Sequence, residues 1–287
     1  MADGITPNVD VSDIAPNATE LDEAQERDYR WRTMVWGNEG IGKSHFAYTS
    51  PGPIAFIDTE GKAAEIAHKF DKEVFIFEPS DYEGAVEALD QSIELLDEYR
   101  RQGNTIGTIV VDSMSIMWDW AQQHYVEMYY PQRDPEEVEL SSGLQPGGNS
   151  DWKKIKQLHN ADFRQKMTDT PYHICWTAMR EDDYQEVFEG DGDVGDKPGG
   201  EKHNRYKVNH IIRLYEDDEG RPVGNLEKSG MVRTHYEGLA YPTHEKHAEV
   251  VQRIDDLEQR SSVDDDIKGD LPHGARLKTS SNNTESE

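Results

Sequence analysis

One short segment limits the possible folds of this chain more than any other feature. It reads Gly37, Asn38, Glu39, Gly40, Ile41, Gly42, Lys43 and Ser44, and His45 follows it. An apolar run at 33–36 precedes the segment, and a helical pattern at 43–50 continues from it. The pattern G-x-x-x-x-G-K-[ST] between a strand and a helix is typical of a phosphate-binding loop, because its backbone N–H groups can turn inward around phosphates. We therefore predict that residues 37–45 bind a nucleotide, and we call 37–44 the P-loop.

The chemistry of this loop gives two of its side chains separate tasks. Lys43 is expected to reach the β and γ phosphates of ATP, and the Ser44 hydroxyl is expected to bind Mg²⁺. A second metal residue should come from a neighbouring strand. The apolar run 108–111 ends in Asp112, whose carboxylate would meet the ion through water. The sequence thus predicts a site for ATP and Mg²⁺ with Ser44 and Asp112 as metal residues.

Apolar runs alternate with helical patterns over the first half of the chain. The pairs are 33–36 with 43–50, 54–57 with 61–70, 74–77 with 82–101, and 106–111 with 114–129. This alternation predicts an α/β fold, with a mostly parallel central sheet and helices on both faces.

The second half of the chain is less regular. A loop at 131–150 is followed by an amphipathic helix at about 151–168, a fifth strand at 172–177 and a polar loop at 181–204. Strand-like segments at 206–215 and 222–228 have no helix between them. They predict an antiparallel extension or hairpin at the edge of the sheet.

Both ends of the chain are polar and have no sustained apolar period. We predict a disordered acidic tail at 1–28, one ATPase domain at 29–260 and a disordered polar tail at 261–287.

The charge is the unusual part of the composition. In 287 residues, 58 Asp and Glu stand against 30 Lys and Arg, which gives a formal charge of −28. The carboxylates are spread along the chain, a pattern that we interpret as that of a protein from a salt-loving host. An acidic protein from an ordinary host is the alternative interpretation.

The location of the protein follows from what the sequence lacks. Its apolar runs are too short to cross a membrane, and the first residues do not have the pattern of a secretory signal. The single Cys175 cannot form an intramolecular disulfide. We expect a soluble cytoplasmic protein without a membrane partner, in the host cytoplasm if the protein is viral.

The end of another predicted strand indicates which class of P-loop protein this chain resembles. The run 53–57 ends in Asp58, Thr59 and Glu60. Together with Val-Val-Asp-Ser at 110–113, it resembles the RecA family of recombination ATPases over roughly residues 30–235. The resemblance is closest to the single-domain RecA-like ATPases of phages and archaeal viruses, some of which anneal single strands. It implies a RecA-like P-loop NTPase fold in which Glu60 is the catalytic carboxylate that orients water. The alternative is that Glu60 is a solvated carboxylate or a helix cap. We interpret Asp58 as structural.

The resemblance weakens at the fifth strand. RecA proteins usually end this strand with Asn-Gln, whereas this chain reads Thr177-Ala178. The phage-type relatives often carry such a pair, so the difference favours that branch and puts strand exchange in doubt. Thr177 has two interpretations: it hydrogen-bonds a phosphate-bound water, or it only caps the strand.

A basic segment follows that strand, where RecA-like proteins contact DNA. Residues 181–196 hold eight carboxylates, whereas 197–207 holds Lys197, Lys202, Arg205 and Lys207 against one glutamate. Because phosphates are bound by local Lys and Arg, we predict that these four residues bind single-stranded DNA at the carboxyl end of the sheet, on the nucleotide side. A solvated loop with some ion pairs is the alternative.

The resemblance also implies self-association into a ring or filament. Lys228 falls where RecA-like subunits present a basic residue to a neighbour's ATP, and a surface lysine is the other interpretation. The motif His244-Glu245-Lys246-His247 does not match H-E-x-x-H, so we predict no zinc site.

These features predict a Mg²⁺-dependent RecA-like ATPase that acts on single-stranded DNA in recombination or replication. Two other functions stay open. One is a nucleotide-dependent switch that binds a protein partner, with little turnover and no DNA. The other is a small-molecule kinase, although no Arg-rich lid segment is evident.

Overall fold

A computed structural model describes residues 29–103, 106–134, 137–142, 150–183, 195–260 and 271–278. The chain divides into two units, Met1–Arg30 and Trp31–Glu287, and the architecture below is that of the second unit. The predicted tail at 1–28 and most of the predicted tail at 261–287 lie outside the described residues.

The elements alternate as the sequence predicts. The first half contains β1 (Arg32–Gly37), α2 (Lys43–Tyr48), β2 (Ile54–Asp58), α3 (Ala63–Ala67), β3 (Val74–Phe77), α4 (Tyr82–Arg101), β4 (Thr108–Asp112) and α5 (Met114–Tyr129). The second half contains α6 (Asp151–Leu158), the π-helical η3 (His159–Gln165), α7 (Lys166–Thr168), β5 (His173–Asp183), β6 (Gly195–Pro198), η4 (Asn204–Tyr206), β7 (His210–Glu216), β8 (Pro222–Lys228), β9 (Tyr236–Glu237), β10 (Leu239–Ala240), α9 (His244–Arg260), η5 (Pro272–Gly274) and β11 (Arg276–Leu277).

The central sheet is mostly parallel, which confirms the predicted fold class. Its strand order is β10-β8-β7-β1-β5-β4-β2-β3, and β8 and β10 form the antiparallel extension. The predicted hairpin at the edge is confirmed, because β7 and β8 pair in antiparallel fashion. The strand β7 also pairs in parallel with β1 and so joins the hairpin to the parallel part of the sheet.

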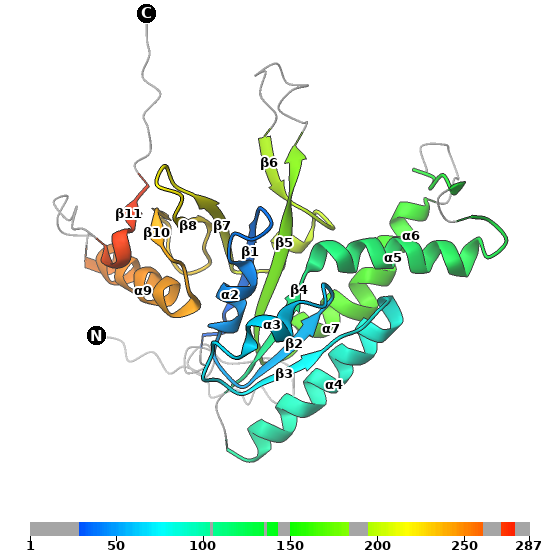
Figure 1. Ribbon diagram of the computed structural model, residues 1–287, viewed down its shortest axis with the longest axis horizontal. Coiled ribbons are helices and arrows are strands. Elements are labelled where there is room, and N and C mark those ends of the chain that lie inside the picture. Colours follow the sequence, from blue (N-terminus) through cyan, green and yellow to red (C-terminus); the bar gives the residue numbers. More distant parts are fainter. Residues whose placement is uncertain are drawn as a thin grey trace, which may run out of the picture. The chain divides into compact units, whose positions relative to one another are not determined.

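Helices cover both faces of the sheet because successive strand residues point to opposite sides. Met34 and Trp36 of β1 face a core with α4, α5 and α6, whereas Val35 faces a core with α2 and α9. In Figure 1, α4, α5 and α6 accordingly lie apart from α9. Three helices begin at side-chain caps: Asp81 accepts from Gly84 N–H, Ser113 from Ile116 N–H and Ser150 from Lys153 N–H. Across the described ranges, no helix is both long and apolar enough to span a membrane.

The strand β5 is longer than predicted and carries a hairpin. Its last residues, 180–183, pair in antiparallel fashion with β6. The strands β5 and β7 both run parallel to β1. The chain must therefore return from β6, at the carboxyl ends of the strands, to their amino ends before β7 can begin. Asn209 N–H accordingly donates to the carbonyl of Arg32 at the start of β1. The segment 199–209 is therefore a crossover from the carboxyl edge to the amino edge.

Residues 271–278 differ from the disorder predicted for 261–287. Leu271 and Ala275 are buried in the core that includes α9. The strand β11 pairs with β9, where Leu277 lies opposite Tyr236. Leu277 also packs against this core, but these apolar residues are isolated in the sequence and give no periodic signal.

A cluster of aromatic rings connects the residue before β1 with β7, β9 and α9, and all of its rings except the half-buried Trp31 are buried. The Trp31 ring lies 4.8 Å from His210, 5.3 Å from His244 and 5.5 Å from His247. Tyr236 Oη and His247 Nδ1 are 2.9 Å apart. Burial lowers the pKa of His210 and of His244 to about 3, and it lowers the pKa of His247 well below the ordinary value. The positive charge of Lys228 also lowers the pKa of His210, and that of Lys72 lowers the pKa of His244.

We expect this cluster to make the fold acid-sensitive. Because the folded-state pKa values are lowered, the unfolded chain takes up protons that the folded chain does not once the pH falls below about 6.5. The free energy of unfolding is therefore highest above that pH. It decreases as the pH falls toward the folded-state pKa values, by up to about 1.4 kcal/mol per pH unit for each histidine. Denaturant unfolding at fixed KCl, from about pH 8 to about pH 5, measures this slope.

The variant His247→Gln should reduce the dependence of the unfolding free energy on pH by up to about 1.4 kcal/mol per pH unit, which is the contribution of one histidine. An identical slope in His247→Gln and the unmodified protein would contradict the assignment.

Candidate functional site

The P-loop joins β1 to α2 through backbone conformations that suit glycine. Gly40 and Gly42 have φ of 75° and 102°, in the left-handed region that other residues rarely adopt. Gly42 is the N-cap of α2. Lys43 Nζ donates to the carbonyls of Gly37 (3.2 Å) and Asn38 (2.8 Å). Burial lowers the pKa of Lys43, and the negative charge of Asp112 partly offsets this shift.

Gly37 is constrained by the sheet. A Cβ atom at this position would lie 2.4 Å from the carbonyl oxygen of Leu214 in β7. The first glycine of the motif is therefore required by the close approach of β7 to β1.

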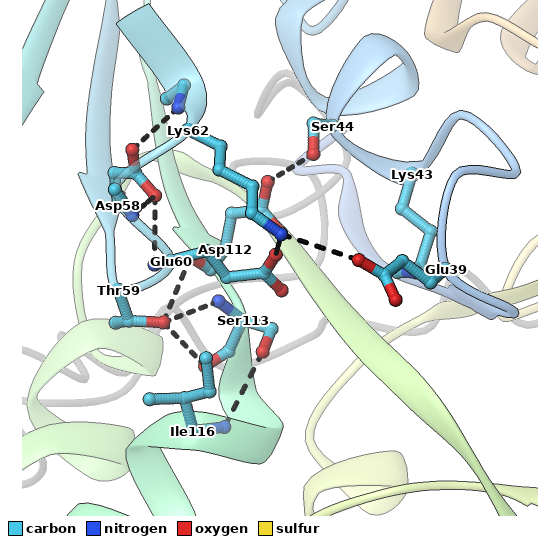
Figure 2. Close-up of polar contacts among 12 residues, drawn as sticks. Glu39, Lys43, Ser44, Asp58, Thr59, Glu60, Lys62, Asp112, Ser113 and Ile116 are labelled. Atoms are coloured by element: carbon cyan, nitrogen blue, oxygen red, sulfur yellow. Dashed lines mark hydrogen bonds and ion pairs between the residues drawn. The ribbon is translucent and has the colours of Figure 1, made fainter.

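The two predicted metal residues meet directly. Ser44 Oγ donates to Asp112 Oδ2 at 2.5 Å, as Figure 2 shows. The expectation that the Asp112 strand would neighbour the P-loop strand was wrong, because β5 lies between β1 and β4. Thr177 of this intervening strand donates its hydroxyl to Asp112 Oδ1. Both carboxylate oxygens of Asp112 are thereby oriented, and burial raises the pKa of this carboxyl group.

These donors fit Mg²⁺. The ion takes oxygen ligands and usually binds proteins through one or two carboxylates, completing its shell with substrate phosphates and water. Ser44 and Asp112 supply a hydroxyl and a carboxylate at one point. Over the described ranges, no cluster of three or more His, Cys, Asp or Glu residues could hold a metal without a substrate.

Glu60 is held beside this pair by its own turn. Asp58, at the end of β2, accepts hydrogen bonds from the backbone N–H groups of Glu60, Gly61 and Ala63, so Asp58 has the structural role expected. The Glu60 side chain is 20 % exposed, and its Oε2 lies 3.8 Å from Lys62 Nζ. Burial raises the pKa of Glu60, and the negative charge of Asp112 adds to this effect.

One cavity of about 460 Å³ brings the main predicted residues together. Lys43, Ser44, Glu60 and Asp112 all line it. Its volume is within the range of small-molecule sites. A cationic side chain, two metal donors and a half-buried carboxylate therefore face one space.

Comparison with known families agrees with this geometry. A family model described as an AAA domain matches residues 29–212, which is more than half of the chain. The chain belongs to the AAA domain family. The match confirms a P-loop domain of the ATP-binding type. A search of curated proteins found no match.

Glu39, Gly40, Gly42 and His45, which were also predicted to bind the nucleotide, line the same cavity, whereas Thr177 and Lys228 do not. Thr177 is fully buried behind Asp112, where it positions the carboxylate. Lys228 lies at the amino edge of the sheet, and its Nζ donates to the carbonyls of Arg205 and Val208. Its action on a neighbour's ATP, and assembly into a ring or filament, stay predictions.

The expected place of the basic segment was wrong in part. Lys197 lies on β6, at the carboxyl edge, where its Nζ is 3.7 Å from Asp183. Lys202, Arg205 and Lys207 belong to the crossover that leads to the amino edge. The parallel pairing of β7 causes the difference, because the chain must cross the sheet to begin that strand.

Three residues near the P-loop were missed by sequence reasoning. Lys62 lies between Glu39 and Glu60 (Figure 2), and its position two residues after Glu60 was the available signal. Arg180 Nη1 lies 3.4 Å from the P-loop residue Asn38. Tyr241 lines a second cavity, of about 260 Å³, beside the P-loop, and its distance along the chain left no signal.

Proposed function

We propose that this AAA domain is a Mg²⁺-dependent ATP hydrolase whose turnover is coupled to single-stranded DNA, as in the RecA-like ATPases of recombination or replication. The observation that carries the proposal is the cavity in which Lys43 and Glu60 face the oxygen pair of Ser44 and Asp112. Hydrolysis needs these groups together: a cation for the phosphates, metal donors and a carboxylate that orients water.

Each side chain has a defined part in the proposed reaction. Lys43 binds the β and γ phosphates, and P-loop N–H groups hold their oxygens. Glu60 orients the water whose oxygen attacks the γ phosphorus, while the bond to the bridging oxygen of ADP breaks. Mg²⁺, when held by Ser44 and Asp112, neutralises charge on the phosphates. Thr177 keeps the Asp112 carboxylate in place.

The DNA partner is supported by local charge. In a chain of net charge −28, the crossover segment presents Lys202, Arg205 and Lys207. The acidic composition also supports a salt-loving host or its virus, because repulsion among carboxylates opposes folding unless salt screens it. In about 1 M salt the screening length is about 3 Å, so only such local contacts can bind DNA.

The test is ATP turnover with and without single-stranded oligo(dT), in a KCl series that extends to about 1 M and beyond, where screening is strongest. We expect turnover that needs Mg²⁺, disappears with EDTA, increases with oligo(dT) and is highest at high KCl. No turnover in any salt would overturn the hydrolase. ATP binding with negligible turnover and no DNA effect would instead favour the nucleotide-dependent protein switch.

A further inference from the structure

A second large depression lies away from the P-loop cavity. It is a groove of about 740 Å³ between the helical segment 152–164 and the segment 203–207. Lys153, Lys156 and Arg164 lie along the first wall, and Tyr206 and Lys207 lie along the second. We call it the α6 groove.

The α6 groove is basic in a strongly acidic protein. Among the described residues that line it, four are Lys or Arg and none is Asp or Glu. The buried Glu201 offsets one of these charges, because its carboxylate lies 2.7 Å from Arg164 Nη1 and 3.7 Å from Lys156 Nζ. The groove thus keeps a local excess of positive charge, which anionic ligands require.

Two of the cations are available to a ligand. Lys153 is exposed, and within the described ranges neither Lys153 nor Lys207 forms an ion pair. Lys207 Nζ donates only to the neutral amide of Gln165, at 3.0 Å. By contrast, Lys197 lies near Asp183 and Lys166 is paired with Asp90.

The groove also contains aromatic faces. Tyr206 is 71 % exposed, the largest exposure among the large apolar side chains of the described residues. Trp152 is half-buried on the facing wall, with its ring 6.4 Å from Trp118. Aromatic faces in a basic groove suit unpaired bases, because every base has a face that can stack while its phosphate meets a cation.

The two walls are held in place before any ligand binds. Arg164 Nη1 donates to Glu201 Oε2 and to Asn204 Oδ1, at 2.7 and 3.2 Å. Lys228 Nζ also holds the segment 203–207 by donating a hydrogen bond to the carbonyl of Arg205, at 2.9 Å. A preformed groove reduces the ordering cost of binding.

We propose that the α6 groove is a single-stranded DNA site, in which Lys153 and Lys207 contact phosphates and Tyr206 stacks on a base. This inference rests on the proposed coupling to DNA, and it moves the contact surface from the carboxyl edge to the space between α6 and the crossover. It adds Lys153 and Trp152, which the pattern of the helix alone did not single out as DNA ligands.

The first test uses charge-matched variants. Fluorescence anisotropy of labelled oligo(dT) is measured across KCl concentrations at which every variant melts cooperatively. Lys153→Gln combined with Lys207→Gln should weaken binding and lower the salt slope by about 0.7 for each phosphate contact, or about 1.4 in all. The control is Lys154→Gln combined with Lys166→Gln. It has the same charge change, but Lys154 lies over the Tyr125 and Tyr129 rings and Lys166 is paired with Asp90.

The second test separates stacking from charge. Tyr206→Ala should weaken binding about tenfold at every KCl concentration without changing the salt slope, since stacking of one base is of this size. Tyr206→Phe keeps the ring and should bind as the unmodified protein does. Oligo(dT) should also quench the fluorescence of Trp152, as judged by the difference between unmodified protein and Trp152→Phe.

The outcomes distinguish this site from the proposed function. If the unmodified protein binds oligo(dT) but the groove variants match the control, the site lies elsewhere and DNA coupling stands. If the unmodified protein hydrolyses ATP but binds no oligo(dT) in any salt, DNA coupling and the groove are both overturned. Equal competition by poly-L-glutamate would also overturn the site, because it would indicate an acidic protein ligand.

Discussion

Replacing Lys43 with alanine is expected to abolish nucleotide binding or to lower turnover by about 10²–10³, which is the usual cost of removing one preorganised charge-stabilising donor. The ammonium is buried against the carbonyls of Gly37 and Asn38. The Lys43 ammonium therefore already lies inside the loop that would surround the phosphates. None of the other P-loop residues, 37–42 and Ser44, carries a positive side chain.

Equilibrium binding of ATP and steady-state turnover measure this effect. Lys166→Ala is the control, because it removes the same charge from an ion pair with Asp90 outside the cavity. A cooperative melt of Lys43→Ala shows that the variant is folded. Unchanged turnover in folded Lys43→Ala would refute the assignment of the P-loop.

The second large effect is expected for Glu60→Gln, which should lower turnover by roughly 10²–10⁴, the contribution of a positioned acid or base. ATP affinity should stay close to that of the unmodified protein. The turn itself is preserved in the variant, because Asp58 binds the backbone N–H of Glu60 and does not use its side chain. The substitution therefore removes the carboxylate of Glu60 and leaves the backbone turn that positions this residue unchanged.

Single-turnover hydrolysis and ATP binding together decide the role of Glu60. Glu83→Gln has the same charge change on the exposed first turn of α4 and serves as the control. If ATP affinity collapsed while turnover at saturating ATP survived, Glu60 would be a structural residue of the nucleotide pocket.

The residues of the proposed site could be found from sequence because each lies in a contiguous pattern. The P-loop carries its own strand and helix context, and Glu60 and Asp112 each follow a short apolar run. The carboxyl ends of parallel strands meet at one edge, so these runs predict a common site. The place of β5 between β1 and β4 gave no local signal, and the contact of Thr177 with Asp112 followed from it.

The rest of the fold depended on pairings between distant segments. The charged residues 180–183 do not resemble a strand, yet they extend β5 because β6 pairs with them. The direction of β7 was not visible in its sequence either, and it determines where Arg205 and Lys207 lie. The sequence thus shows that the basic segment exists, but it does not show that Lys202, Arg205 and Lys207 belong to the crossover.

The contact between Gly37 and β7 affects how loss-of-function variants should be interpreted. A Cβ at Gly37 would collide with a strand backbone, whereas at Gly40 and Gly42 no heavy atom beyond the adjacent residues lies within 4 Å of the corresponding position. A side chain at Gly40 or Gly42 meets the local strain of a positive φ but no clash with another strand. In a mutational scan, more of the inactive variants at these two positions than at Gly37 should therefore accumulate as folded protein that fails to hold nucleotide. Inactive variants at Gly37 would be depleted from the soluble fraction. Activity alone would score all three glycines as equivalent ATP contacts, and only a parallel measurement of protein abundance would separate them.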